Sequence, residues 1–243
     1  MWTAFKNHWK LYLMEALGLG IFMISACYFY GTLYSPQGAL FGLLPGPGLR
    51  QLLMGLSMGA TALFIFYSPW TAPSGAQINP AVTISFLFLK RIPLQDALFY
   101  ILFQFLGGTL AVYLMTFLRG PVLTAPPVSY GITIPGKYGV PAACLMEFGI
   151  AFIMISTVLF SFQSSRWKKY TKIWASCLVG MYVMVAGPVS GFGMNPARSF
   201  ASAFPAGNWT DFWIYLIIPP VSMLSASAFF VAVNRRRKIK KVF

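Results

Sequence analysis

Charged residues are scarce in this sequence, and their scarcity indicates whether the protein folds in water or in a membrane. Charged residues make up 9% of the 243 residues, whereas soluble domains contain roughly 25%. Hydrophobic residues make up 58%. So little charge excludes an ordinary soluble domain and indicates a membrane protein.

Residues that bind metals or carry out acid–base chemistry are also rare. The chain has 4 acidic residues, a single histidine, His8, and 3 cysteines without a CxxC spacing. Cys27, Cys144 and Cys177 lie in or beside apolar runs, and we interpret them as small core residues. His8 precedes the first predicted span. No metal site and no cofactor are therefore predicted, and the lack of a nucleophile–base arrangement argues against an enzyme.

Long apolar runs dominate the sequence instead. A helix needs roughly 20 mostly apolar residues to cross the hydrocarbon core of a bilayer. Six runs predict such spans, at about 11–34, 49–68, 97–118, 142–163, 172–189 and 210–233. The first run is too long for a cleaved signal peptide, and a second follows soon after it. We expect a single transmembrane domain over residues 1–243.

Basic residues predict the orientation, because Lys and Arg collect in cytoplasmic loops. Most of them lie before span one, between spans two and three, between spans four and five, or after span six; the opposite loops hold only Arg50, Arg119 and Lys137. Both termini are therefore predicted to be cytoplasmic. We interpret the net charge of +14 as this signal and as attraction to anionic lipid, not as a nucleic-acid site. Residues 234–243 are predicted to form a basic cytoplasmic tail that anchors the topology, with trafficking or lipid binding as the alternative.

One short motif occurs twice. The segments SGAQINPAVTISF at 74–86 and SGFGMNPARSF at 190–200 share Ser, Gly, Asn, Pro and Ala at positions 116 residues apart. The tripeptide LME also recurs, at 13–15 and 145–147. Three spans per half is an odd number, so the second half enters the membrane in the opposite sense. The sequence therefore predicts two inverted repeats, at about 9–119 and 140–233.

Each Asn-Pro-Ala motif predicts the start of a helix that is too short to cross the membrane. Asn79 and Asn195 are favourable N-caps, and a proline follows each at the first helical position. About ten helical residues span roughly 15 Å, half of a ~30 Å hydrocarbon core. Two such helices from opposite faces meet near the midplane. The segments before them, 75–78 and 191–194, are expected to be extended and to turn their carbonyls toward a water-filled lumen.

These features resemble the aquaporin and glycerol-facilitator family over essentially the whole chain. The residues that carry the resemblance are the two Asn-Pro-Ala motifs, the arginine after the second, and a glutamate in the first span of each half: Asn79, Pro80, Ala81, Asn195, Pro196, Ala197, Arg198, Glu15 and Glu147. The resemblance implies an all-α membrane protein with six transmembrane helices and two re-entrant half-helices around a pore. It also implies a homotetramer in which each subunit conducts separately, in the plasma membrane or, in a bacterium, the inner membrane.

The midplane residues are predicted to pass neutral molecules and to stop cations. The two asparagine amides would donate hydrogen bonds to passing water, while the positive ends of the two half-helices oppose hydronium and sodium. Arg198 is expected to line the outer mouth, with a structural ion pair as the alternative. Glu15 and Glu147 are expected to accept hydrogen bonds from loop N–H groups, with proton transport as the alternative.

The choice of solute is less clearly indicated. By resemblance, the outer constriction contains Arg198, Phe192, Val183 and Met54. Phe192 and its flanking segment look closer to the glycerol-conducting branch, whereas Ser199 and Ala203 look like the water-conducting branch. We predict a passive channel for water that also admits small neutral solutes and excludes protons and ions. The alternatives are a glycerol or small-polyol facilitator and a proton-coupled secondary transporter.

Overall fold

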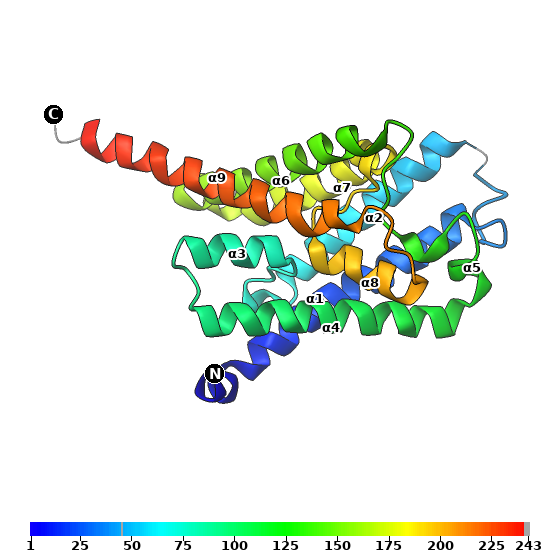
Figure 1. The fold of residues 1–243 in the computed structure, drawn as a ribbon, viewed down its shortest axis with the longest axis horizontal. Coiled ribbons are helices and arrows are strands. Elements are labelled where there is room, and N and C mark those ends of the chain that lie inside the picture. The colour runs from blue at the N-terminus through cyan, green and yellow to red at the C-terminus, as the bar shows by residue number, and fades with distance from the viewer. Residues whose placement is uncertain (45, 241–243) are drawn as a thin grey trace.

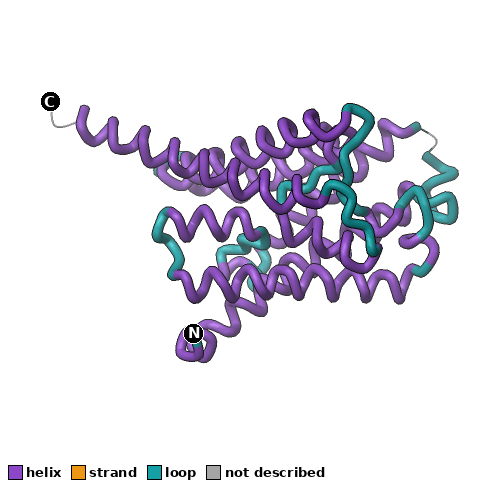
Figure 2. The backbone as a smooth tube through the Cα atoms, in the orientation of Figure 1, coloured by secondary structure: helices purple, strands orange, loops and turns teal. Residues whose placement is uncertain are grey.

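Helices make up most of the chain that the computed structural model describes, which is residues 1–44 and 46–240, without the side chains of 236–240. The α-helices are α1 (Trp2–Tyr34), α2 (Pro47–Tyr67), α3 (Pro80–Phe88), α4 (Leu94–Arg119), α5 (Pro121–Thr124), α6 (Gly139–Gln163), α7 (Thr171–Ser190), α8 (Pro196–Ala206) and α9 (Phe212–Lys240) (Figure 1). Short 3₁₀ turns are η1 (Ala72–Ser74), η2 (Ser129–Gly131) and η3 (Lys168–Tyr170). Helices and loops account for all of the described residues (Figure 2).

Six of the helical segments are long and apolar enough to cross a membrane, which confirms the six predicted spans. They are Trp2–Tyr34, Pro47–Tyr67, Leu94–Arg119, Gly139–Gln163, Lys168–Ser190 and Phe212–Arg235. The helix that contains the first predicted span is longer than that span, since it starts before residue 11 and includes His8. α1 starts at Trp2, because Phe5 packs on α4, with its ring centroid 5.4 Å from that of Phe99.

The two halves of the chain interlock through their half-helices. α1 packs against α4 in the first half, α6 packs against α9 in the second, and α2 and α7 join the halves. α3 and α8 lie between α4 and α9, and each contacts the last helix of the other half (Figure 1). This arrangement confirms the predicted all-α fold with two inverted repeats.

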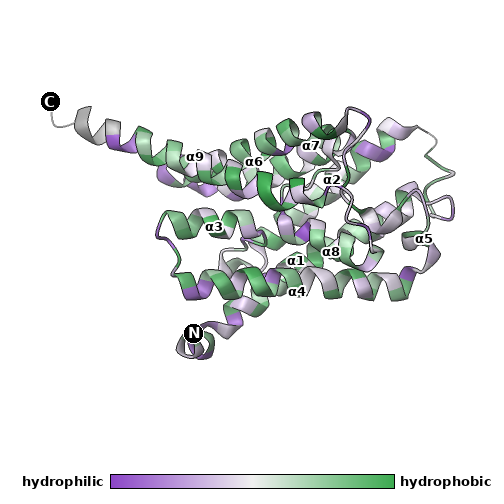
Figure 3. Ribbon diagram, viewed as in Figure 1, coloured by the Kyte–Doolittle hydropathy of each residue, from purple (hydrophilic) through white to green (hydrophobic). Residues whose placement is uncertain are grey.

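The distribution of polarity is the one expected in lipid. Hydrophobic residues occur along all of the long helices (Figure 3), and many large ones are exposed in the single chain. On α4, Leu98, Leu102 and Leu106 repeat every four residues and are 47%, 49% and 48% exposed. Glu15 and Glu147, in contrast, are fully buried. Lipid would cover the leucine stripe, while the polar groups face the centre of the bundle.

Two smaller sequence predictions also meet the structure here. Cys27 is buried and Cys144 is partly buried, but Cys177 is exposed on α7. The interpretation of Cys177 as a core residue is therefore wrong, since it lies on the outward side of its helix. The predicted basic tail, 234–243, begins inside α9, which continues to Lys240; residues 241–243 and the side chains of 236–240 lie outside the described part of the chain.

Candidate functional site

The half-helices α3 and α8 start at the two Asn-Pro-Ala motifs because their asparagines cap them. The side-chain oxygen of Asn79 accepts a hydrogen bond from the backbone N–H of Ala81, at 2.9 Å. The side-chain oxygen of Asn195 accepts from the N–H groups of Ala197 at 3.1 Å and Arg198 at 3.2 Å. Pro80 and Pro196 occupy the first helical positions, where a missing N–H costs nothing. α3 contains 9 residues and α8 contains 11, so each spans about half of a ~30 Å core.

The two asparagines also tie the halves together. Asn79 Nδ2 donates to the carbonyl of Met194 at 3.0 Å, and Asn195 Nδ2 donates to the carbonyl of Ile78 at 2.6 Å. Each carboxamide thus caps its own half-helix and binds the loop of the other half. Because a carboxamide has two N–H groups, one remains on each residue after this exchange. The cross-bonds were not foreseen from the sequence, because nothing local shows which carbonyl each amide faces.

Glu15 and Glu147 hold the two loops from behind, at matched positions. Glu15 accepts hydrogen bonds from Ser74 Oγ at 2.6 Å and from the backbone N–H groups of Gln77 at 2.9 Å and Ile78 at 2.6 Å. These three donors belong to the buried loop, where each of them needs an acceptor. Gln104 Nε2 also donates to Glu15, at 2.8 Å.

Glu147 makes the corresponding contacts in the second half. It accepts from Ser190 Oγ at 2.6 Å, from Gly193 N at 2.8 Å and from Met194 N at 2.5 Å. The structure therefore places both glutamates against the loop N–H groups that they were expected to bind. Every one of these contacts uses a carboxylate oxygen as an acceptor, so neither side chain lies free in a lumen.

The loops themselves differ from the prediction of extended backbone, which is wrong. In residues 75–78 the φ angles of Gly75, Ala76 and Ile78 are 91°, 45° and 42°. In residues 191–194, Gly191, Phe192 and Met194 have φ angles of 76°, 53° and 48°. Left-handed values are unfavourable for side chains other than glycine. They persist here because this backbone conformation turns successive N–H groups toward the glutamates. The carbonyls of Ile78 and Met194 then face the asparagine of the other half.

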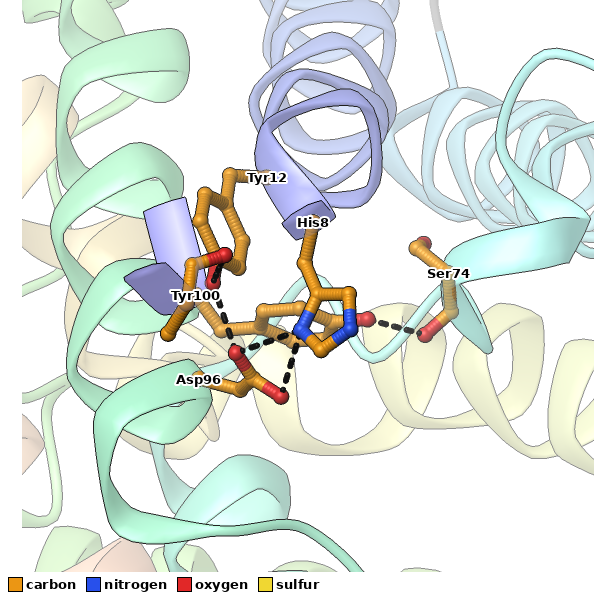
Figure 4. Close-up of polar contacts among 6 residues, drawn as sticks. His8, Tyr12, Ser74, Asp96 and Tyr100 are labelled. Atoms are coloured by element: carbon orange, nitrogen blue, oxygen red, sulfur yellow. Dashed lines mark hydrogen bonds and ion pairs between the residues drawn. The ribbon is translucent and has the colours of Figure 1, made fainter. Parts of the chain in front are cut away.

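Two tyrosines that sequence reasoning did not assign to the site fix the start of each loop. Tyr100 Oη on α4 donates to the carbonyl of Ser74 at 2.9 Å, and Tyr215 Oη on α9 donates to the carbonyl of Ser190 at 2.6 Å. Figure 4 shows Tyr100 reaching Ser74, with His8, Tyr12 and Asp96 clustered nearby. The two tyrosines are 115 residues apart, close to the motif spacing of 116, and that match was the signal that could have revealed them.

A cavity of about 220 Å³ runs past the meeting point of the half-helices. Most of its lining is apolar, from residues such as Phe22, Phe86 and Ile155. The polar side chains on it include Gln77 and Thr171 together with both asparagines. A mostly apolar cavity with a few polar groups suits a small solute that exchanges hydrogen bonds as it moves.

The residues expected at the outer constriction fall into two groups. Arg198 and Phe192 line the cavity, and Arg198 is 4% exposed with its Nη1 atom buried and without a protein partner in the described part of the chain. Val183 on α7 and Met54 on α2 are also buried, at 6% and 3% exposed, but neither lines this cavity. The structure thus brings Arg198 and Phe192 together with the asparagines, and holds Val183 and Met54 in the wall formed by α2 and α7.

Among the described residues, His, Cys, Asp and Glu side chains form no group of three that could hold a metal ion. The chain matches the major intrinsic protein family over residues 2–230. The chain belongs to this family.

Relatives within the major intrinsic protein family support the assignment along the whole chain. Aquaporin TIP4-4 of Zea mays is 34% identical over 182 residues, which are 73% of this chain and 71% of that protein. Aquaporin-4 of Bos taurus is 30% identical, and the match covers 100% of this chain and 74% of that protein. The aquaglyceroporin from Plasmodium falciparum shares the fold with a TM-score of 0.72 at 20% identity, covering 92% of this chain and 95% of that one.

Proposed function

We propose that this protein is a passive membrane channel for water, which also admits small neutral solutes such as glycerol and excludes protons and ions. The observation that carries the proposal is the pair of asparagine carboxamides where two half-helix N-termini meet, on the wall of a mostly apolar cavity. The names of the Zea mays and Bos taurus relatives agree with this function.

In the proposed mechanism, water loses its hydrogen-bond chain at the midplane. Asn79 and Asn195 each use one N–H in the cross-bond between the halves and keep one for the passing molecule. A water that accepts from both amides turns its hydrogens away from them, so it cannot donate to the neighbouring water at that point. Each half-helix also presents roughly half a positive charge at its N-terminus. Neutral molecules pass, while hydronium and sodium meet a positive potential.

Arg198 adds a fixed positive charge on the outer side of the midplane. Its guanidinium is buried on the cavity wall, and in the described residues no carboxylate pairs with it. We assign Arg198, Phe192, Val183 and Met54 to the outer constriction. Arg198 provides charge and hydrogen-bond donors and Phe192 provides bulk on the cavity wall, while Val183 and Met54 limit the width from the wall formed by α2 and α7. An arginine exposed to lipid would be costly, so a position that lines water accounts for its presence.

The buried glutamates argue against a proton-coupled transporter. Glu15 accepts four hydrogen bonds and Glu147 accepts three. A residue that carries protons needs to release its partners during the cycle, and here the partners are the N–H groups that shape the pore loops. We therefore assign both acids to support of the loops.

A glycerol or small-polyol facilitator is the second candidate. Phe192 on the cavity wall and the apolar lining around it favour a solute with a carbon backbone. Water remains the first assignment, because the cavity is small, about 220 Å³, and because the bulky side chains of Arg198 and Phe192 both line it.

We further propose that both termini face the cytoplasm, that the membrane is the plasma membrane or a bacterial inner membrane, and that four copies form a homotetramer. The basic residues on the side of the termini support the orientation. The start of α1 and the far end of α9 lie at the same end of the molecule (Figure 1), as this orientation requires.

Stopped-flow light scattering on proteoliposomes tests the function. We expect the purified protein to raise osmotic water permeability well above that of empty liposomes, with a low activation energy, no saturation and no dependence on a proton gradient. Glycerol and urea gradients applied to the same vesicles separate the two candidates. A glycerol flux that greatly exceeds the water flux would favour the facilitator, and flux that needs a proton gradient would reject a channel.

A further inference from the structure

Near its outer end, α7 contains a proline that leaves one carbonyl without its helical partner. In an α-helix, the N–H of residue 188 would bind the carbonyl of Met184, but Pro188 has no N–H. A bare carbonyl at membrane depth costs several kcal/mol unless another donor reaches it. The helix nonetheless continues past Pro188 to Ser190.

The missing donor comes from α2. Gln51 Nε2 lies 3.2 Å from the carbonyl oxygen of Met184 and 2.9 Å from that of Val183. The carboxamide has two N–H groups, one for each carbonyl, and both acceptors require its nitrogen on this side. Tyr34 Oη on α1 lies 3.4 Å from Gln51 Oε1 at the other end of the amide. Gln51 therefore replaces the N–H that Pro188 lacks.

Gln51 reaches these carbonyls because α2 and α7 approach closely. A Cβ atom on Gly55 would lie 2.7 Å from the carbonyl oxygen of Gly180, so the contact is open only to glycine. At Gly187, an added Cβ would lie 2.9 Å from Gln51 Nε2. Both glycines thus leave space for the helices to meet and for the carboxamide to enter between them.

The parts of α2 and α7 that Gln51 links carry residues that we assign to the outer constriction. Met54 follows Gln51 by three residues on α2, and Val183 provides one of the two bound carbonyls. After Pro188, α7 ends at Ser190, whose hydroxyl binds Glu147 and whose carbonyl binds Tyr215. Phe192 comes two residues later. A shift of the last turn of α7 would therefore move both Val183 and the loop that holds Phe192.

We infer that Gln51 is a positioning residue for solute selectivity: it compensates for Pro188 and so fixes the outer end of α7 and the width of the outer constriction. This inference rests on the proposed function as a water and small-solute channel. It requires no contact between Gln51 and the solute.

The test compares Gln51→Leu, Pro188→Ala and the double variant in proteoliposomes, with the ratio of glycerol to water permeability as the readout. Gln51→Leu removes the donor, so the constriction loosens and the ratio rises by about fivefold, equivalent to ~1 kcal/mol. Pro188→Ala restores an N–H for the Met184 carbonyl, so this variant alone stays close to the natural ratio. The double variant returns to within about twofold of it, because the carbonyl again has a partner within its own helix.

Gln163→Leu is the matched control, since Gln163 is exposed at the end of α6 and binds Asn234. Its ratio should equal that of the natural protein. An unchanged ratio in folded Gln51→Leu would overturn the inference, and so would a double variant that keeps the altered ratio. If Gln51→Leu does not fold, Gln51→Asn, one methylene shorter, is compared in the same way with and without Pro188→Ala. Water permeability of the natural protein tests the proposed function separately from all of these ratios.

Discussion

The two inverted halves of the molecule keep the same bonds at the pore and different groups around them. In both halves a glutamate and a tyrosine hold the loop, a serine links it to the glutamate, and an asparagine caps the half-helix. This shared set shapes the backbone at the midplane. The duplicated chain has retained what the loop geometry requires in each half.

The first difference lies behind the loops. In the first half, Gln104 on α4 donates to both Glu15 and Thr83, at 2.8 and 3.2 Å. The spacing of 115 residues that relates Tyr100 to Tyr215 relates Gln104 to Pro219, which has no side-chain donor. Ser199, which matches Thr83, has a buried hydroxyl without a partner among the described residues. The glutamate behind the first loop therefore accepts one more hydrogen bond than the glutamate behind the second.

The second difference is a charge inside the cavity. Three residues after its asparagine, the first half has Val82 and the second half has Arg198, and both line the cavity. The first half thus places an apolar side chain on the cavity wall at the position where the second half places a positively charged one. The comparison indicates that selection between solutes is concentrated on one side of the midplane.

Removing either glutamate should have the largest effect. Glu15→Leu and Glu147→Leu each leave two backbone N–H groups buried without partners, at a cost of several kcal/mol per group. We expect both variants to aggregate in detergent and to lose water permeability. The effect of Glu15→Leu should be the larger, because Gln104 also loses its acceptor. Size-exclusion chromatography in detergent and stopped-flow measurements would check this order. Full water permeability in either variant would show that the loops are held by other contacts.

Arg198→Val makes the two arms of the pore alike. We expect the fold to be retained and the glycerol-to-water permeability ratio to rise by about tenfold, equivalent to ~1.4 kcal/mol, with greater proton leak, because the outer arm loses both its charge and its bulk. Val82→Ala, at the corresponding position of the first half, is the matched control and should alter the ratio much less. Equal effects in the two variants, measured in the same vesicles, would contradict the assignment of selectivity to the outer side.

Gln104→Leu should make the first loop resemble the second. It removes two hydrogen bonds and leaves the three protein donors that Glu147 also has. We expect the free energy of unfolding to fall by about 1–2 kcal/mol, with water permeability largely retained. Thermal unfolding in detergent, followed by tryptophan fluorescence, measures the change. Loss of conduction at unchanged stability would show that Gln104 acts on the pore directly.

The smallest effect is expected at the start of α1. His8 Nδ1 lies 3.0 Å from Asp96 Oδ1, and Tyr12 donates to the same carboxylate at 2.6 Å (Figure 4). The corresponding positions in the second half are Val140, Asp211 and Cys144. The His8 side chain is 45% exposed, so solvent weakens its interaction with Asp96. His8→Ala should therefore lower the free energy of unfolding by less than ~1 kcal/mol. Asn7→Ala, at an exposed neighbouring position, is the control in the same thermal-unfolding measurement. If His8→Ala lowers the stability as much as Gln104→Leu does, the His8–Asp96 interaction is stronger than expected.

Much of the fold was readable from the sequence because lipid imposes simple rules. Apolar length gives the six spans, and Asn-Pro at the head of a short apolar run gives the half-helices. Both signals are local. The odd number of spans in each half then fixes the inversion, and with it the meeting of Asn79 and Asn195.

The details of the site needed the structure because they depend on contacts between distant segments. The left-handed φ angles at Ala76 and Ile78 are unfavourable locally and arise from their tertiary bonds. The cross-bonds of Asn79 and Asn195 depend on which carbonyl each loop presents. Gln51 gave no sequence signal, since its role exists only opposite a proline that is 137 positions further along the chain.

The exchange of hydrogen bonds between Asn79 and Asn195 also constrains biosynthesis. Each loop is bound by a carboxamide that belongs to the other half. When the ribosome has synthesised only the first half, neither cross-bond can form. Until the second motif is synthesised and inserted, the Ile78 carbonyl lacks its partner. The midplane pair of carboxamides that we assign to the channel is therefore complete only after translation has passed Asn195.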